Sequence, residues 1–379
     1  MNILVLAHNQ DDGSPYVSFV HSQVRAYIKL GHSVTVISPV TVGKKYSNWT
    51  GKKHVVVDGV SIYYIPCISF SNYGKYFLNN YFGYFSIRRV VKKLLKIQKY
   101  DIIHAHTIGY DGNIAVMLKK KFSIPVVITT HGSDIFVEKR AGKEDYISEI
   151  CKKANGIVGV STKLKDALLE ISPELESKLN VVMNGFEHLV FSDLKKKYTI
   201  LQVGSLIPRK KVDITIKAFK KIVSLFPEAT LTIIGEGGEL ERLKKLCQIL
   251  NLEQKVTFIG QIKNNEVLSW MGKSEIFIMP SVNEGMGIVY LEAMNSGCIT
   301  IGTFGEGITD IIENGVNGFL ANPDDVEEIS DLFKICFSMS EEEKRNMAKK
   351  AKKTVNSLTW ENNAKRYIKI FENILAEEK

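Results

Sequence analysis

The chain has 379 residues, of which 45% are hydrophobic and 24% charged, so it is too long for one ordinary hydrophobic core and too apolar to be disordered. Its five cysteines include no C-x-x-C pair, which argues against a disulfide framework or a zinc site and favours a reducing cytoplasm. No stretch of about 18 apolar residues is present, and the apolar residues 3–7 are too few for a signal peptide, so neither a membrane span nor secretion is expected.

The net charge of +9 lies in the first half of the chain. Residues 1–190 carry 24 Lys and Arg against 15 Asp and Glu, and the totals of 50 and 41 leave 26 of each kind for the rest. A basic half predicts an anionic partner, which is a nucleic acid, an anionic membrane surface or an acidic substrate.

The pattern of the first 37 residues predicts a strand, a helix and a second strand. Residues 2–7 are an apolar strand, 11–15 a turn-rich loop, 17–30 an amphipathic helix and 34–37 a strand. No G-x-G-x-x-G follows the first strand, and residues 34–39 offer no acidic side chain for a ribose. A dinucleotide-dependent dehydrogenase is therefore not favoured.

A hairpin signal and an aromatic, basic segment come next. Asp58-Gly59 predicts a tight turn between two strands. Seven aromatic residues between Tyr73 and Phe85 precede an amphipathic helix, whose candidates for a membrane or acceptor surface are Arg88, Arg89, Lys92 and Lys93. This helix either lies on an anionic membrane or packs its aliphatic side on the sheet and leaves its basic side chains solvated.

Two further strands end in histidines. Residues 101–106 end in His104-Ala105-His106, and residues 126–130 run into His131-Gly132-Ser133-Asp134. Apolar strands separated by a helix predict a parallel sheet, in which these histidines mark the strand ends where ligands bind. A histidine at such a place is more often structural than catalytic, and His131 is the better functional candidate.

After a polar linker around residues 195–197 the pattern restarts. Strands are predicted at 200–204, 231–234, 256–260, 276–280 and 298–302, with helices at 212–226, 341–356 and 360–378. Most of these strands run into glycine, which predicts a second doubly wound α/β domain. The expected domains are therefore 1–193 and 194–358, with the last helix, 360–379, packing back on the first domain.

The most informative stretch, within 276–297, is an apolar strand, a glycine-bearing loop and an apolar helix from Ile288 to Met294. In a parallel sheet, such a junction is a ligand crevice, and the start of the helix attracts anions. Glu284 and Glu292 lie eight residues apart, a spacing that puts two helical side chains on different faces. We expect Glu284 to accept hydrogen bonds from hydroxyls near the anion and Glu292 from a second polyol, although each taken alone also fits a solvated surface position.

A cation is expected beside this crevice. Lys210 follows the strand 200–204 in a basic loop and is placed to neutralise a diphosphate, with Arg209 and Lys211 as competitors for that role. The same loop also fits a solvated turn. Together, the helix start, the cation and the two carboxylates describe a site for a diphosphate joined to two polyols, which is the shape of a nucleotide sugar.

In their order and spacing, the motifs resemble the family-four glycosyltransferases, retaining enzymes of the GT-B fold. In the second half the matching motifs are Gly204-x3-Pro208-x-Lys210, Gly235-Glu236-Gly237, Val256-x-Phe258-x-Gly260, Pro280-Ser281, Glu284-Gly285-x-Gly287-x4-Glu292 and Asn317-Gly318. In the first half they are Gly31-His32-x-Val34-Thr35-Val36, Asp101-Ile102-Ile103-His104-Ala105-His106, His131-Gly132-Ser133-Asp134 and Asn184-Gly185. The resemblance implies two Rossmann-like domains facing an interdomain cleft, the first binding the acceptor and the second the nucleotide sugar.

The resemblance also implies roles for single residues. Glu292 would hold the ribose, Glu284 the donor sugar and Lys210 the diphosphate, while His131 would face the donor sugar from the other domain. The remaining donor-site candidates are Gly13, Ser205, Arg209, Gly235, Gly285, Met286, Gly287 and Ile288, with Gln261 and Ile262 flanking the base. His131, Lys210 and Glu284 are the expected catalytic residues.

The sequence departs from the family in three places. Ser205 stands where a diphosphate-binding arginine is common, so Arg209 substitutes for it or Lys210 acts alone. Glu187 stands where an aspartate is common. Glu306-Gly307-Ile308-Thr309-Asp310 replaces a usual Gly-Gly-Ile-Pro-Glu. We expect these last two departures to affect a helix start or the domain interface more than the chemistry.

The expected activity is transfer of a hexose or N-acetylhexosamine to a saccharide acceptor, with retention of configuration. A lipid-linked acceptor in bacterial surface-polysaccharide synthesis, at the inner face of the plasma membrane, agrees with the basic aromatic segment. No Asp-x-Asp occurs, so neither a metal nor a cofactor is expected. The alternatives are a nucleotide-sugar epimerase of the same fold and a nucleic-acid-binding protein, although nucleic acid is not the expected partner.

Overall fold

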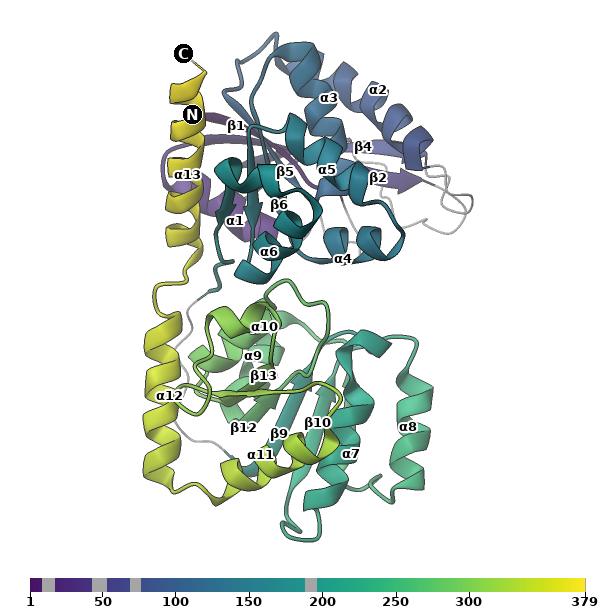
Figure 1. Ribbon diagram of the computed structural model, residues 1–379, viewed down its shortest axis with the longest axis vertical. Helices are drawn as coiled ribbons and strands as arrows, with labels where there is room; N and C mark the ends of the chain where they lie inside the picture. The colour runs from purple at the N-terminus through teal and green to yellow at the C-terminus, as the bar shows by residue number, and fades with distance from the viewer. Residues whose placement is uncertain (9–17, 43–52, 69–75, 188–195, 379) are drawn as a thin grey trace. The chain divides into compact units, whose positions relative to one another are not determined.

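The protein divides into two compact units in the computed structural model, which describes residues 1–8, 18–42, 53–68, 76–187 and 196–378. Unit 1 comprises Met1–Gly185 and Trp360–Lys379, and unit 2 comprises Phe186–Thr359 (Figure 1). The expected boundary between residues 193 and 194 falls outside the described residues. No helix in the described ranges is long and apolar enough to cross a membrane.

Unit 1 is built on an eight-stranded sheet in the order β3-β4-β2-β1-β5-β6-β7-β8. Its strands are β1 (Asn2–Leu6), β2 (Ser33–Val42), β3 (His54–Val57), β4 (Val60–Ile68), β5 (Ile102–His106), β6 (Val126–Thr130), β7 (Gly156–Gly159) and β8 (Leu179–Val181). All pairs are parallel except β3 with β4, the hairpin that Asp58-Gly59 predicts. The strand order reverses beside β1, so the carboxyl ends of β1, β5 and β6 meet at the edge where ligands bind in such sheets.

Helices cover the sheet of unit 1, and the last helix of the chain is one of them. They are α1 (Ser18–Lys29), α2 (Tyr76–Leu94), α3 (Asn113–Phe122), α4 (Ser133–Arg140), α5 (Glu144–Lys153), α6 (Thr162–Ile171) and α13 (Trp360–Glu377). Helix α13 lies beside α1 (Figure 1). Its Tyr367 hydroxyl lies 3.0 Å from Thr129 Oγ1, and Asn363 accepts a hydrogen bond from Gln23 at 2.7 Å. Side-chain hydrogen bonds to both the sheet and α1 thus hold α13 against the rest of unit 1.

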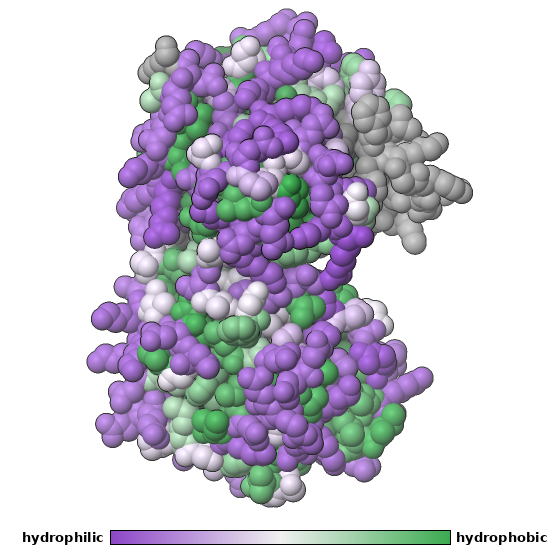
Figure 2. Space-filling view, in the orientation of Figure 1, coloured by the Kyte–Doolittle hydropathy of each residue, from purple (hydrophilic) through white to green (hydrophobic). Residues whose placement is uncertain are grey.

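Unit 2 is a wholly parallel sheet in the order β11-β10-β9-β12-β13-β14. Its strands are β9 (Lys196–Val203), β10 (Thr230–Ile234), β11 (Val256–Gly260), β12 (Ser274–Ile278), β13 (Ile299–Thr303) and β14 (Phe319–Ala321). Its helices are α7 (Val212–Ile222), α8 (Leu240–Ile249), α9 (Asn264–Lys273), α10 (Ile288–Asn295), α11 (Val326–Ser338) and α12 (Glu341–Val355). Buried aliphatic strand residues and the inward sides of α7 and α11 make one core, which includes Phe219 and Phe333. The visible outer sides of α12 and α13 are mostly hydrophilic (Figure 2).

His104 is a buried structural histidine in the middle of the sheet of unit 1. Its Nε2 lies 2.8 Å from Thr129 Oγ1, and its Nδ1 lies 3.3 Å from the Tyr27 hydroxyl. Burial, with a smaller contribution from His131, lowers the pKa of His104 to about 3. Because this pKa lies below the unfolded value of about 6.5, the stabilisation is complete above pH 6.5 and is lost as the pH falls toward 3.

We therefore expect the free energy of unfolding to fall by about 2 kcal/mol between pH 6.5 and pH 5 through His104 alone. Urea unfolding of the wild type and of His104→Gln across this range measures the difference in slope. His54→Gln, at an exposed position, is the matched histidine-to-glutamine control. Equal slopes in the wild type and in His104→Gln would contradict the assignment.

Candidate functional site

The candidate site of unit 2 lies where loops leave the carboxyl ends of β9 and β12. The loop after β9 forms a short 3₁₀ turn, Pro208–Lys210, and ends at Lys211, whose φ is +50°. The loop after β12 leads to α10, which begins at Ile288 as the sequence predicts. The backbone N–H of Val282 donates to the carbonyl of Arg209 at 2.9 Å, so the two loops are joined directly.

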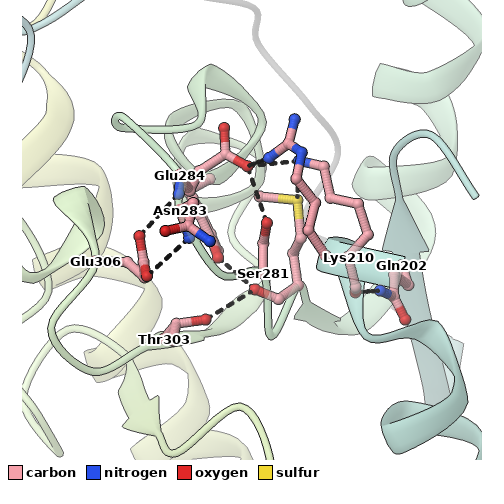
Figure 3. Close-up of polar contacts among 10 residues, drawn as sticks. Gln202, Lys210, Ser281, Asn283, Glu284, Thr303 and Glu306 are labelled. Atoms are coloured by element: carbon pink, nitrogen blue, oxygen red, sulfur yellow. Dashed lines mark hydrogen bonds and ion pairs between the residues drawn. The ribbon is translucent and has the colours of Figure 1, made fainter. Parts of the chain in front are cut away.

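Lys210 and Glu284 form an ion pair at the centre of this site. Lys210 Nζ lies 2.6 Å from Glu284 Oε2 (Figure 3), and it also lies 3.5 Å from Met279 Sδ. Lys210 is only 8% exposed, and its carbonyl accepts a hydrogen bond from Gln202 Nε2 at 3.0 Å. The structure therefore places Lys210 as a fixed, buried cation and not as part of a solvated turn.

The same carboxylate oxygen of Glu284 has two further partners. Arg209 Nη1 donates to it at 3.1 Å and Ser281 Oγ at 3.0 Å. Burial raises the pKa of Glu284, but Lys210, Arg209 and Ser281 outweigh burial and hold that pKa below its usual value. Burial lowers the pKa of Lys210, although Glu284 opposes the shift. The negative charge of a deprotonated Glu284 thus pairs with the positive charges of Lys210 and Arg209.

Glu306 binds the backbone of the loop that joins β12 to α10. Its Oε1 accepts the backbone N–H of Asn283 at 3.0 Å, and its Oε2 accepts that of Glu284 at 2.8 Å (Figure 3). Asn283 has a left-handed backbone, with φ +55°, which these bonds stabilise. The Glu306 departure is expected to affect a helix start or the domain interface; in the structure Glu306 precedes the turn Gly307–Asp310, makes no side-chain cap bond to it and instead bonds the backbone that carries Glu284.

We expect Glu306→Gln to lower kcat about tenfold with little change in nucleotide affinity, because an amide N–H₂ would face one of the two loop N–H groups and cost one charge-assisted hydrogen bond. Steady-state kinetics and nucleotide titration measure the two effects separately. Glu313→Gln, at an exposed position of the same unit, is the control. An unchanged kcat in Glu306→Gln would show that the loop keeps its geometry without this carboxylate.

Helix α10 begins at Ile288, four residues after Glu284, so the backbone N–H groups of its first turn follow that carboxylate closely in the chain. Gly287 caps the helix with φ +75°, and a Cβ there would press on the Tyr290 ring, so glycine is required. The first turn contains no acidic residue. This helix start and Lys210 thus provide two independent attractions for an anion.

Glu292 lies four residues into α10 and has partners different from those of Glu284. Asn264 Nδ2 donates to Glu292 Oε1 at 3.4 Å. Burial raises the pKa of Glu292, partly offset by Asn264, and Glu187 raises it further. The two carboxylates are thus not one acid-base pair, in agreement with the expectation of separate partners.

The glycine loops at the ends of β9, β10 and β11 bring the other candidates of unit 2 to one sheet edge. Gly235 has φ +138°, and a Cβ there would overlap the Gly204 carbonyl oxygen, so only glycine fits. The N–H of Gln261 donates to Glu236 Oε1 at 3.4 Å, and Ile262 is half-buried next to it. Ser205 is exposed and Arg209 half-buried. Gly285 and Met286 are buried in the loop before α10.

The remaining candidates belong to unit 1 or fall outside the description. His131 follows β6, where its Nε2 lies 3.1 Å from His106 Nδ1. Burial lowers the pKa of His131 to about 3, so the ring is neutral at neutral pH. Gly13 lies outside the described residues.

Helix α2 packs its aliphatic side on unit 1 and turns basic side chains outward. Ile87 and Val91 are buried, and α2 contacts β4 and α3. Arg89, Lys92 and Lys93 are exposed, and Arg88 is half-buried. These contacts agree with the alternative of a helix that packs its aliphatic side on the sheet and leaves its basic side chains solvated. The same exposed basic side chains carry the charge that binding to an anionic surface would need.

Sequence reasoning missed several residues of the site. Ser281, to which the sequence assigns no role, donates a hydrogen bond to Glu284. Asn264 of α9 donates a hydrogen bond to Glu292. Glu306 carried a signal, since a carboxylate stood where the family usually has glycine. Among the described residues, no group of three or more His, Cys, Asp or Glu is arranged to hold a metal ion.

Comparisons with known proteins match nearly the whole chain. The profile described as Glycosyltransferase Family 4 matches residues 17–188, and that described as Glycosyl transferases group 1 matches residues 187–354. The N-acetyl-alpha-D-glucosaminyl L-malate synthase of Bacillus anthracis is 28% identical over 74% of this chain and 76% of its own length. The UDP-Gal:alpha-D-GlcNAc-diphosphoundecaprenol alpha-1,3-galactosyltransferase of Escherichia coli is 27% identical over 62% and 66%. The structure of Anabaena HepE in complex with UDP and glucose has a TM-score of 0.77 at 18% identity, covering 98% of this chain and 100% of that one.

Proposed function

The chain belongs to glycosyltransferase family 4 and has the GT-B architecture of two Rossmann-like units, and we propose that it transfers a hexose or N-acetylhexosamine from a nucleoside diphosphate sugar to a saccharide acceptor with retention of configuration. The observation that supports this proposal is the buried Lys210–Glu284 pair at the start of α10. A cation, a carboxylate and a helix start at one place suit a diphosphate bonded to a sugar.

In this proposal, binding of the nucleotide sugar separates Lys210 from Glu284. Lys210 moves its charge from Glu284 to the diphosphate, and the carboxylate of Glu284 is then available to the sugar hydroxyls. The bond from the anomeric carbon to the diphosphate oxygen breaks, and a bond from that carbon to the acceptor oxygen forms on the same face. The acceptor proton passes to the departing diphosphate, whose charge Lys210 and the helix start stabilise.

The remaining donor contacts are part of the same proposal. Glu292 holds the ribose, and the backbone at Gln261 and Ile262 flanks the base. The names of the Escherichia coli relative and of the HepE complex mention UDP-Gal and UDP, which favours a uridine nucleotide.

A screen of nucleotide sugars by thermal shift and by donor hydrolysis tests the donor. We expect one uridine diphosphate sugar to raise Tm most and to be hydrolysed slowly in the absence of acceptor. If no nucleotide sugar raises Tm or is turned over, the proposed function is wrong.

We further propose that the reaction needs no metal and no cofactor besides the nucleotide sugar, because Lys210 and the helix start serve the diphosphate. Transfer measured in excess EDTA should equal that of the untreated enzyme. Activity that is lost in EDTA and restored by a divalent cation would contradict this part.

An acceptor-dependent product separates this function from its alternatives. A nucleotide-sugar epimerase would isomerise the donor alone, so a new hexose in pure donor would favour the epimerase. Salt-sensitive binding to nucleic acid would favour the nucleic-acid-binding alternative.

We propose that the acceptor is lipid-linked and that α2 holds the protein to an anionic membrane, in bacterial surface-polysaccharide synthesis. The diphosphoundecaprenol acceptor in the name of the Escherichia coli relative and the outward charge of α2 support this. Glutamine at Arg88, Arg89, Lys92 and Lys93 should abolish sedimentation with anionic liposomes. The matched control carries glutamine at Arg345, Lys349, Lys350 and Lys353 of α12 and should still sediment. Equal sedimentation of both variants would refute the role of α2.

A further inference from the structure

Strands β1, β5 and β6 are neighbours in the sheet of unit 1 (Figure 1), and a second polar cluster lies at their carboxyl ends. His8 follows β1, His106 ends β5 and His131 follows β6. The rings of His106 and His131 are stacked with centroids 5.4 Å apart. This is the edge beside the reversal of strand order, where parallel sheets bind ligands.

Asp111 anchors the cluster. It is fully buried in the turn Ile108–Gly112 and accepts two hydrogen bonds from His8, from Nδ1 at 2.7 Å and from the backbone N–H at 3.2 Å. Thr107 Oγ1 donates to the same Oδ2 at 3.4 Å. A carboxylate only accepts, so it holds a proton on His8 Nδ1; a ring that carries its single proton there has Nε2 as a hydrogen-bond acceptor.

Two atoms of this cluster are buried without a protein partner. Asp111 Oδ1 and His106 Nε2 make no hydrogen bond within the described part of the chain. Buried polar atoms are nearly always paired, so unpaired ones at a ligand-binding edge indicate a site completed by a bound polar group.

We propose that this cluster is the acceptor site and that His8, oriented by Asp111, binds the attacking hydroxyl group of an uncharged sugar unit of the acceptor and accepts its hydrogen bond on Nε2. This inference rests on the proposed function and specifies its acceptor. His8 positions the nucleophile, and the proton still leaves with the diphosphate.

The charge of the cluster decides the class of acceptor. Burial lowers the pKa of both His106 and His131, so these rings stay neutral at neutral pH beside the buried carboxylate of Asp111. Neutral rings and a carboxyl group that already bonds His8 accept hydroxyl protons and offer little attraction to an anionic group. The cluster is therefore suited to a neutral sugar and not to a dicarboxylate such as malate, although one relative is named as a malate synthase.

The test is transfer from the selected donor to octyl N-acetylglucosaminide, compared with L-malate. The wild type should glycosylate the octyl glycoside and leave malate unreacted. Asp111→Asn should lower transfer at least a hundredfold, because an amide N–H₂ facing Nδ1 moves the ring proton to Nε2 and turns the acceptor atom into a donor. The thermal shift caused by the nucleotide, which depends on unit 2, should not change.

A second His–Asp pair of unit 1 provides the control. His21 Nε2 lies 3.1 Å from Asp58 Oδ2 at the surface, and Asp58→Asn should transfer at the wild-type rate. His8→Gln, whose side-chain oxygen replaces Nε2, should retain more transfer than His8→Leu.

The outcomes separate this inference from the proposed function. Wild-type transfer in Asp111→Asn, equal transfer in His8→Gln and His8→Leu, or a wild type that prefers malate would overturn the acceptor site while the donor chemistry stands. Should Asp111→Asn fail to fold, the two His8 variants decide. Absence of both a nucleotide-induced shift and donor turnover in the wild type would overturn the proposed function itself.

Discussion

Replacing Lys210 by alanine is expected to lower kcat for sugar transfer about a thousandfold, which is the loss typical of removing a preorganised charge from the position where charge develops. Lys210 is buried, is held through its carbonyl by Gln202 and lies 2.6 Å from Glu284. In the proposed mechanism, Arg209 and the start of α10 are the positive partners that the described residues would still offer to the departing diphosphate. Nucleotide diphosphate affinity should fall as well, which isothermal titration with UDP measures.

The neighbouring lysine is a close control for this prediction. Lys211 Nζ lies 2.5 Å from the exposed Asp324, a surface ion pair with little expected effect on activity. Lys211→Ala should therefore keep kcat and UDP affinity within a factor of about two. If Lys210→Ala and Lys211→Ala lose activity equally, the basic loop acts through its net charge, and the role assigned to Lys210 is wrong.

Glu284→Ala is the second substitution with a large expected effect, again a loss of about a thousandfold in kcat, because it removes the carboxylate assigned to the donor sugar. The structure sharpens the expected binding result. Glu284 balances Lys210 and Arg209 before the donor arrives, so its removal leaves both cations to the diphosphate. UDP affinity should then stay the same or increase while transfer is lost. Titration with UDP and steady-state transfer, measured on the same preparation, report both quantities.

Two variants check the Glu284 prediction. Glu284→Gln keeps the size and loses the charge, and we expect it to be nearly as inactive as the alanine variant. Asp324→Asn removes the carboxylate of the neighbouring surface pair and should leave transfer unchanged. Full transfer in Glu284→Ala, or a loss of UDP affinity as large as the loss of kcat, would refute the assignment of Glu284 to the sugar.

The two substitutions are also expected to be coupled. Each side chain is the partner of the other at 2.6 Å, so the double variant should lose less activity than the sum of the two single losses. A purely additive double-mutant cycle would mean that the two residues act on the donor independently.

Much of the architecture follows from local sequence patterns. Apolar runs such as Ile276-Phe277-Ile278 predict parallel strands, and Asp58-Gly59 predicts the hairpin between β3 and β4. The helix predicted from Ile288 begins at that residue, and the one predicted from Glu341 begins there too. These features depend on backbone preferences and on side-chain periodicity over a few residues, which any sequence displays directly.

The exact ends of some elements and the contacts within the site did not follow from such patterns. Helix α7 ends at Ile222 and not at Phe226, and β14 was not predicted. The contacts of Glu306 were not predicted, because a motif position shows which residue is unusual but not which backbone it contacts.

By itself, the sequence determined that this protein has two α/β domains and carries a cation, two carboxylates and glycine turns at strand ends, because each of these is encoded within a short segment. Only the tertiary structure decided which of them meet. Lys210 and Glu284 are 74 residues apart, and His8 and Asp111 are 103 apart. Both pairs form because strands distant in sequence are neighbours in a sheet, and the order and register of those strands depend on the packing of the whole unit.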